Sequence, residues 1–136
     1  MSLNVVLKKF TQISSYDEWI DKIFSVVKTG LPKNDIIRNI NYRDSLGSSR
    51  IDKNLILPHI VNGELQESYV VISQINKAVR YIDCKPVSNA IVVVSKPNDP
   101  SVGSFIDRLV DDEFIQRICN GKLNNQKLRE LLKGKR

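Results

Sequence analysis

The fold is decided by residues 55–95, which read LILPHIVNGELQESYVVISQINKAVRYIDCKPVSNAIVVVS. This stretch contains four apolar runs, at residues 55–57, 69–75, 79–82 and 90–95. Their length and their content of Val and Ile are typical of buried strands. Pro58 disfavours the helical region for the residue before it, so the first run is extended. We therefore expect His59 at or just beyond the end of a strand.

The residues before this stretch are expected to form one strand and two helices. Leu3–Leu7 has the composition of a short first strand. Ser15 and Glu18 form a capping box, in which a serine hydroxyl caps the first turn and a glutamate follows three residues later. Apolar residues then recur at helical spacing until Gly30, which ends that helix. A second helix is expected from near Pro32 to about Tyr42.

The order of elements across the whole chain predicts the fold class. Asn76-Lys77 is expected to turn a hairpin between the second and third apolar runs. After the strands we expect three helices, the first capped by Ser101 or Ser104, the second opened by Asp111–Glu113 and the last begun by Asn124-Asn125. Strands in the middle with helices at both ends indicate an α/β sandwich. We expect a three-layer-like arrangement, in which a central mixed β-sheet is flanked by helices on both faces.

Length and composition exclude several classes of protein. The chain has 136 residues, enough for one domain that spans residues 1–136. Apolar residues make up 41% of it and charged residues 26%, which excludes a disordered chain. The longest apolar run, residues 90–94, is far shorter than the ~20 residues that a membrane-spanning helix needs, so we expect no membrane insertion.

The cysteine and histidine content argues against a disulfide framework and a metal centre. Cys84 and Cys119 are the only cysteines and form no Cys-x-x-Cys pair, which is typical of free thiols in a reducing compartment. The expected location is therefore the cytoplasm. The single histidine, His59, cannot build a site with several histidine ligands, and we expect no metal and no cofactor.

The chain is basic, with a formal net charge of +6. This charge invites the hypothesis of a nucleic-acid-binding domain without phosphorylation, whose affinity would fall steeply with salt. Much of the excess lies between Lys122 and Arg136, where the pattern favours the solvated face of a last helix. We therefore expect no direct contact with nucleic acid, while an acidic or phosphorylated protein partner stays an alternative.

The segment from Arg43 to His59 contains the residues best suited to phosphoryl chemistry. A neutral imidazole is a nucleophile near pH 7. A phosphoryl group brings negative charge, which needs a cation and hydrogen-bond donors held in place. Arg43, the hydroxyls of Ser48 and Ser49, and backbone N–H groups of the loop supply these. Each residue alone is more often structural, but their combination favours phosphoryl transfer at His59.

This segment resembles the signature of the mannitol/fructose-type enzyme IIA domain of the bacterial phosphoenolpyruvate–sugar phosphotransferase system. The likeness rests on residues 42–46, Ser48-Ser49 and residues 55–59, which give an arginine, a serine-rich turn and an apolar strand ending in Pro-His at the family's spacing. Residues 82–87 and 109–114 also resemble later parts of that domain. The resemblance implies the family's α/β sandwich and a phosphotransferase component.

The resemblance also implies a role for each matching residue. His59 is then the residue that accepts a phosphoryl group from the histidine phosphocarrier protein and passes it to a cysteine on an enzyme IIB domain during sugar uptake. Arg43 stabilises the transferring group, and Ser48 and Ser49 are donors near it. Because the membrane subunit selects the sugar, this domain is not expected to reveal which sugar is taken up.

Three departures from the family pattern favour an alternative. The approach to Pro-His, residues 51–54, contains no glycine, and Asp44 stands where the family usually has glutamate. The loop of residues 95–99 lacks the second histidine that family members often carry, and Asn98 there replaces only a hydrogen bond. The alternative is an enzyme IIA-like regulatory domain of a transcriptional activator or antiterminator, whose activity is set by phosphorylation of His59.

Overall fold

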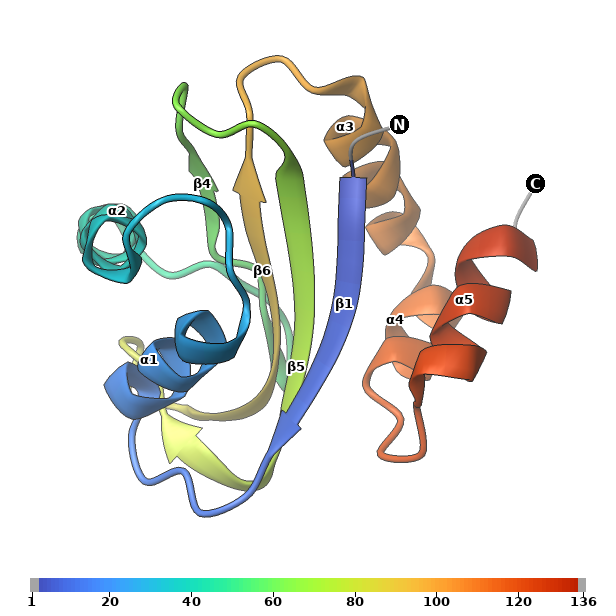
Figure 1. The fold of residues 1–136 in the computed structure, drawn as a ribbon. Coiled ribbons are helices and arrows are strands. Elements are labelled where there is room, and N and C mark those ends of the chain that lie inside the picture. The colour runs from blue at the N-terminus through green and yellow to red at the C-terminus, as the bar shows by residue number, and fades with distance from the viewer. Residues whose placement is uncertain (1–2, 135–136) are drawn as a thin grey trace.

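The computed structural model of the chain describes residues 3–134 (Figure 1). Its strands are β1 (Leu3–Phe10), β2 (Arg50–Asp52), β3 (Leu55–Ile56), β4 (His59–Val61), β5 (Ser68–Arg80) and β6 (Pro86–Ser95). Its helices are α1 (Tyr16–Val26), α2 (Lys33–Ser45), α3 (Pro100–Asp107), α4 (Asp112–Ile118) and α5 (Asn125–Gly134), with a 3-10 turn at Arg108–Val110. The predicted order of one strand, two helices, several strands and then helices is confirmed. No helix in the described part of the chain is long and apolar enough to cross a membrane.

The strands form one mixed sheet in the order β1-β5-β6-β3-β2, and β4 also pairs with β6. β1 is parallel to β5, while β3 and β4 are both parallel to β6. β5 and β6 are antiparallel, as are β2 and β3. The parallel pairing of β4 with β6 sets His59 opposite Val93 and so fixes the place of the histidine on the sheet.

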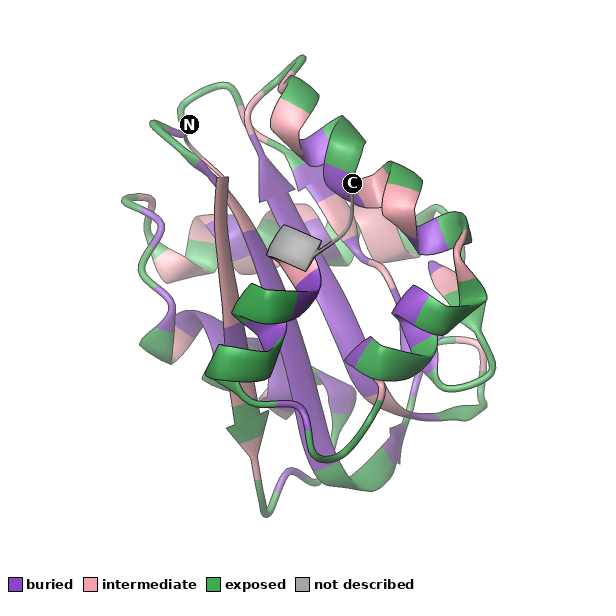
Figure 2. Ribbon diagram, turned by 90° about the vertical axis from the view of Figure 1, so that its right-hand side faces the viewer, coloured by how far each residue is buried: buried purple, intermediate pink, exposed green. Residues whose placement is uncertain are grey.

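Helices cover both faces of this sheet (Figure 1). α1 and α2 lie on one face, in a core that includes Trp19 and Val92. α3, α4 and α5 lie on the other face, in a core that includes Val93 and Phe114. Figure 2 shows this second face, with the buried central strands behind the helices. Successive residues of β6 thus serve opposite cores, as the alternation of side chains along a strand requires. The predicted α/β sandwich with a central mixed sheet is confirmed.

The predicted hairpin turn at Asn76-Lys77 is wrong. β5 continues through both residues, and the turn to β6 lies at residues 81–85. The pairing register between β5 and β6 shifts between Gln74 and Val79, so the two exposed polar residues lie in an irregular part of the strand. Beyond it Val79 is buried and pairs with β6 again, and burial of this apolar side chain favours continuation of the strand.

Two of the expected side-chain caps begin helices where the sequence predicts them. The Ser15 hydroxyl accepts a hydrogen bond from the Glu18 N–H at 3.1 Å, and α1 starts at the next residue. Asp111 accepts in the same way at the start of α4. α1 ends at Val26, earlier than the predicted stop at Gly30, which has a φ of +89° in the connection to α2.

The expected caps of α3, Ser101 or Ser104, are wrong. The carboxylate of Asp99 accepts a hydrogen bond from the Ser101 N–H at 2.9 Å, and a proline follows Asp99 at the first helical position. A carboxylate cap followed by proline is a strong start signal, because the proline lacks only an N–H that the first turn leaves unpaired.

The second helix is longer than predicted. α2 runs to Ser45, so Arg43 and Asp44 belong to its last turn and not to a polar loop. A further difference is the short strand β2, Arg50–Asp52, which the sequence pattern does not predict. The helical setting of Arg43 matters for the site, because the backbone of a helical turn holds a side chain more firmly than a loop does.

Candidate functional site

His59 opens β4, and the backbone on both sides of it is fixed. The Val93 N–H donates to the carbonyl of Pro58 at 2.8 Å, and the Asn62 N–H donates to the carbonyl of Ser95 at 3.0 Å. The imidazole of His59 is half-buried. Its Nε2 atom lies 3.0 Å from the hydroxyl oxygen of Ser95, which ends β6 and is only 2% exposed. The ring is therefore held in one orientation beside the sheet.

The hydroxyl of Ser95 suits a neutral imidazole in either tautomer. A hydroxyl both donates and accepts hydrogen bonds. It donates to Nε2 of His59 when that nitrogen carries no proton, and it accepts from Nε2 when the proton is there. Because Ser95 is buried and packed within β6, this contact restrains the ring without adding charge.

The charge of Arg43 acts on His59. Arg43 lies in the last turn of α2, where its Nη1 atom donates to the carbonyl oxygen of Gly47 at 3.1 Å. Burial lowers the pKa of His59 below its ordinary value of 6.5, and the positive charge of Arg43 lowers this pKa further. The imidazole is therefore neutral at pH 7, the state that a nucleophile needs. The structure therefore places Arg43 where its charge influences the pKa of His59.

Asp44 ties the last turn of α2 to two neighbouring elements. Its carboxylate accepts hydrogen bonds from the hydroxyl of Tyr16 on α1 at 2.8 Å and from the hydroxyl of Tyr81 at 3.4 Å. Burial raises the pKa of Asp44, although both tyrosine hydrogen bonds oppose the change. Burial also raises the pKa values of Tyr16 and Tyr81, so both phenols stay protonated and donate. This network holds the helical turn that carries Arg43.

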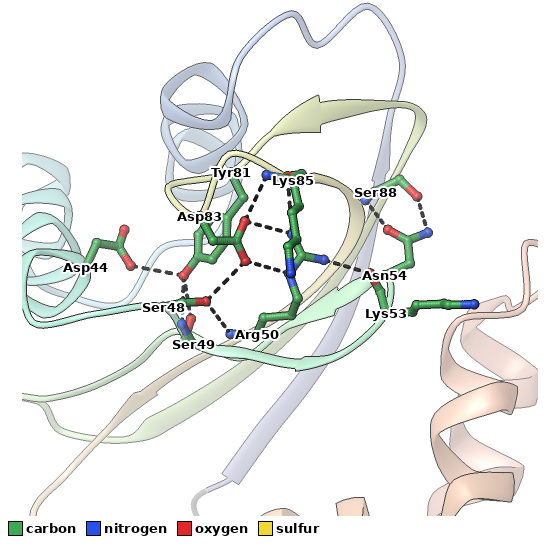
Figure 3. A network of polar contacts seen from close by, with 10 residues as sticks. All are labelled: Asp44, Ser48, Ser49, Arg50, Lys53, Asn54, Tyr81, Asp83, Lys85 and Ser88. Carbon is green, nitrogen blue, oxygen red and sulfur yellow. Dashed lines mark hydrogen bonds and ion pairs between the residues drawn. The ribbon is translucent and has the colours of Figure 1, made fainter.

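Ser48 and Ser49 point into a polar network at the β5–β6 turn (Figure 3). The Ser49 side chain is buried, with its hydroxyl oxygen 2.7 Å from that of Tyr81. The Ser48 hydroxyl accepts from the Arg50 N–H at 3.1 Å and donates to Asp83 at 3.4 Å. Neither hydroxyl forms a hydrogen bond with His59 among residues 3–134. Their predicted role as donors to a phosphoryl group stays a prediction.

Asn98 lies in the loop between β6 and α3 and is exposed. Its backbone has a φ of +56°, a left-handed conformation that asparagine tolerates better than most residues. No hydrogen bond between Asn98 and His59 is present in the described part of the chain; the residue that bonds to the ring there is Ser95. The suggestion that Asn98 replaces a hydrogen bond of a second histidine stays a prediction.

An ion pair between Arg50 and Asp83 fastens the β5–β6 turn to β2 (Figure 3). Nε of Arg50 lies 2.6 Å from Oδ2 of Asp83, and Nη2 lies 3.0 Å from Oδ1. The same guanidinium donates to the carbonyls of Lys53 and Lys85 and lies over the ring of Tyr81 at 5.8 Å. The hydrogen bonds from Arg50, together with its charge, lower the pKa of Asp83 to about 2.

We expect the variant Asp83→Asn to unfold at a lower temperature than the natural chain at pH 7. The pKa of Asp83 is lowered from 3.8 to about 2 in the folded chain, so its ion pair stabilises the fold above pH 3.8 and loses this effect as pH falls toward 2. The difference in melting temperature between the two chains should therefore vanish in that window. Asp35→Asn is the matched control, because Asp35 pairs with Arg38 at an exposed position, where ion pairs contribute little. An equal loss in both variants would contradict the assignment.

The structure adds residues to the site that sequence reasoning missed. Ser95 supplies the hydrogen bond to the imidazole, and Tyr16 and Tyr81 supply the hydrogen bonds to Asp44. Parallel pairing of residues 59–61 with residues 93–95 would have placed Ser95 near the histidine, but the sequence alone does not show that register. No signal in the sequence pairs the two tyrosines with Asp44.

Comparisons with known proteins agree with this geometry. Residues 3–135 match the family described as "Phosphoenolpyruvate-dependent sugar phosphotransferase system, EIIA 2". A search of curated proteins found no match. Two similar solved structures are nitrogen regulatory protein IIA-Ntr from Neisseria meningitidis and IIA mannitol from Escherichia coli. The first is 13% identical with a TM-score of 0.74, covering 93% of this chain and 92% of that one. The second is 19% identical with a TM-score of 0.67, covering 95% of each chain.

At these identities the solved structures show the shared fold, whereas the family match covers nearly the whole chain. The resemblance of the chain to an enzyme IIA domain of the mannitol/fructose type is thereby confirmed. The chain belongs to the EIIA 2 family of the phosphoenolpyruvate-dependent sugar phosphotransferase system.

Proposed function

We propose that His59 carries the phosphoryl group, which it accepts from the histidine phosphocarrier protein in the cytoplasm and passes to a cysteine of an enzyme IIB domain during sugar uptake. One observation above all supports this proposal. His59 is a half-buried imidazole, held by Ser95 and kept neutral at pH 7 by burial and by the charge of Arg43. Membership of the EIIA 2 family supports the same chemistry.

The transfer needs a free nitrogen lone pair and a cation, and the site contains both. A nitrogen of His59 forms a bond to phosphorus as the bond from phosphorus to the donor's histidine nitrogen breaks. The transition state is loose, with negative charge spread over three oxygens. Arg43 offsets that charge, and Ser95 holds the attacking ring in place. In the second transfer, a cysteine thiolate of the partner forms a bond to phosphorus as the bond from phosphorus to His59 breaks. This step leaves a phosphocysteine on the partner and restores neutral His59.

The surface around the site suits a protein partner. Tyr42 and Leu46 flank Arg43 in sequence and are 68% and 66% exposed, and Val61, two residues after His59, is 56% exposed. Exposed apolar side chains beside a reactive group favour docking of another protein surface. One structure with the same fold, 19% identical and with a TM-score of 0.68, is a complex of enzyme IIA mannitol with phosphorylated enzyme IIB mannitol from Escherichia coli. It supports an enzyme IIB domain as the class of acceptor.

The proposal is tested by incubating the protein with radiolabelled phosphoenolpyruvate, enzyme I and the histidine phosphocarrier protein. Label that is stable in base and released in acid is the expected result, because phosphohistidine has this lability. Absence of label under conditions that phosphorylate the carrier would overturn the proposal. Addition of enzyme IIB then separates the two uses of the phosphate: discharge supports transport, and label retained with every candidate enzyme IIB favours the regulatory domain.

We expect the pKa of His59 to lie below 6.5. The pH at which the rate of phosphoryl acceptance falls to half on the acid side should therefore also lie below 6.5. Burial and the charge of Arg43 both disfavour the protonated ring. Since the neutral ring is the nucleophile, the chain should accept phosphate at pH 6.5 with more than half of its imidazole reactive. The chain has one histidine, so its NMR titration gives this pKa without assignment. A midpoint above 6.5 would contradict the structure.

We expect Ser95→Ala to slow phosphorylation roughly fivefold to tenfold, which corresponds to the loss of one hydrogen bond of about 1 kcal/mol. The variant leaves Nε2 of His59 without its partner and frees the ring to rotate. The rate of labelling and the width of the histidine NMR signal measure both effects. Ser104→Ala is the control, because Ser104 is exposed on α3. Equal rates in both variants would remove the role of Ser95.

A further inference from the structure

Tyr81 lies where the two halves of the candidate site meet. It follows β5 directly, begins the turn to β6 and is only 2% exposed. Arg43 belongs to the end of α2, whereas His59 belongs to β4. No hydrogen bond joins Arg43 to His59 within residues 3–134. The spacing of these two side chains therefore depends on contacts made by their neighbours.

The Tyr81 hydroxyl binds the residue next to Arg43. It donates to Oδ1 of Asp44 at 3.4 Å (Figure 3), and the hydroxyl of Tyr16 donates to Oδ2 at 2.8 Å. The two tyrosine rings pack edge to face with their centroids 5.0 Å apart, so each ring restrains the other. Because Arg43 and Asp44 share the last turn of α2, these bonds also restrict the backbone of Arg43.

The same hydroxyl binds the segment that leads to His59. It accepts from the Ser49 N–H at 3.1 Å, and its oxygen lies 2.7 Å from the hydroxyl oxygen of Ser49 (Figure 3). Ser49 is 7% exposed, and its carbonyl accepts from the Leu57 N–H at 2.8 Å. Only Pro58 separates Leu57 from His59. A series of hydrogen bonds thus connects Tyr81 to the backbone just before the histidine.

These contacts use the full hydrogen-bonding capacity of the Tyr81 hydroxyl. A phenol has one hydrogen to donate and two lone pairs that accept. When the hydrogen is donated to Asp44, the lone pairs accept from the N–H and the hydroxyl of Ser49. Burial raises the pKa of Tyr81, so this hydrogen is present at neutral pH. Phenylalanine at this position would keep the ring and lose all three contacts.

We propose that Tyr81 is a positioning residue, which fixes Arg43 relative to His59. It acts on Arg43 through Asp44, and on the backbone before His59 through Ser49. The hydroxyl is bonded to neither Arg43 nor His59 in the described chain, so its action is indirect. A cation stabilises developing charge best when it is held in place before the reaction. The effect on the reaction rests on the proposed phosphoryl transfer, whereas the effect on geometry does not.

Tyr81→Phe tests the proposal through the pKa of His59, which NMR titration measures without any phosphoryl transfer. The charge of Arg43 lowers this pKa, so a less firmly held guanidinium should let the pKa rise. Adding Tyr81→Phe to a chain that already carries Arg43→Ala should leave the pKa unchanged. An unchanged pKa in Tyr81→Phe alone overturns the proposal. An equal rise with and without Arg43 also overturns it, because Tyr81 would then act on the burial of His59.

Ser73→Ala is the matched control for loss of a buried hydroxyl. Ser73 is fully buried and accepts from Nε1 of Trp19 at 2.9 Å beneath α1. Tyr81→Phe is expected to slow phosphoryl acceptance about fivefold to tenfold, while Ser73→Ala changes neither the rate nor the pKa of His59. A rise of the pKa in both variants would show general loosening and overturn the specific role. If the natural chain accepts no label, the proposed function fails, and the pKa still decides the role of Tyr81.

Ser49→Ala tests the same link from its other end, and it serves if Tyr81→Phe does not fold. It removes the 2.7 Å contact and keeps the bond from the Ser49 N–H to Tyr81. A smaller rise in the pKa of His59, together with a slower rate, is the expected result. A slower rate with an unchanged pKa would assign the Ser49 hydroxyl to the phosphoryl group and overturn its link to Tyr81. No change in either quantity overturns the proposal as well.

Discussion

His59→Ala is expected to abolish phosphorylation, with no acid-labile label above background after prolonged incubation with phosphoenolpyruvate, enzyme I and the histidine phosphocarrier protein. The chain has a single histidine, so no second imidazole can accept the group. The substitution removes the nucleophile itself. Loss of a nucleophile typically eliminates the covalent intermediate instead of slowing it.

Controls for this variant separate chemistry from folding. The backbone of β4 pairs with β6 through main-chain groups that Ala retains, so the far-UV circular dichroism of His59→Ala should match that of the natural chain. His59→Gln tests the same point with a side chain that keeps hydrogen-bonding groups but has no nucleophilic ring nitrogen. Base-stable, acid-labile label in either variant would place the phosphate elsewhere. Cys84 is then the first residue to examine, because it is an exposed free thiol.

The parts of the fold that the sequence predicts are those set by local physics. Val92, Val93 and Val94 form a β-branched run that favours a buried strand, and this strand lies in the middle of the sheet. Ser15 and Glu18 begin a helix through their own side chains and need no distant partner. The order of such elements is enough to give the sandwich, because each apolar face must be buried against another.

Two errors in predicting the elements have different causes, one a distant contact and one a local signal. Asn76 and Lys77 have turn-forming character, yet pairing of Val79 with β6 keeps the chain extended through them. Ser101 is a plausible cap, but the carboxylate of Asp99 occupies that position, and it also accepts a hydrogen bond from Ser68 at 2.6 Å. Tertiary pairing therefore overrides local preference at Asn76-Lys77. The start of α3 is instead set by a local signal, the carboxylate of Asp99 followed by proline, which the sequence contains.

The residues of the candidate site also fall into two groups, those that the sequence predicts and those that only the folded chain brings together. Chemistry and spacing identify His59 and Arg43 from the sequence, because a nucleophile and a cation are recognisable as residue types. The partner of the ring, Ser95, depends on the register of two parallel strands that lie far apart in sequence. The hydrogen bonds of Ser49 with Tyr81 likewise depend on a turn that the sequence reading placed elsewhere. Such contacts follow from the packed fold alone.

Arg43→Ala is expected to slow phosphoryl acceptance by about a hundredfold to a thousandfold, the usual effect of removing one group that stabilises transition-state charge. The same substitution should raise the pKa of His59, because the positive charge that disfavours protonation is gone. Burial is the larger cause of the lowered pKa and is unchanged, so the new value should still lie below 6.5. NMR titration of the single histidine measures this shift independently of any rate.

The rate of phosphoryl acceptance and the pKa of His59, measured together, define the role of Arg43. Arg43→Lys keeps a positive charge, so the pKa of His59 should stay near that of the natural chain, while the rate recovers only in part because an ammonium lacks the fork of the guanidinium. Arg38→Ala, on the exposed side of the same helix, is the control and should change neither quantity. A slow rate in Arg43→Ala with an unchanged pKa would mean that the residue acts on the partner protein. An unchanged rate would remove Arg43 from the site, because no transition-state charge would then depend on it.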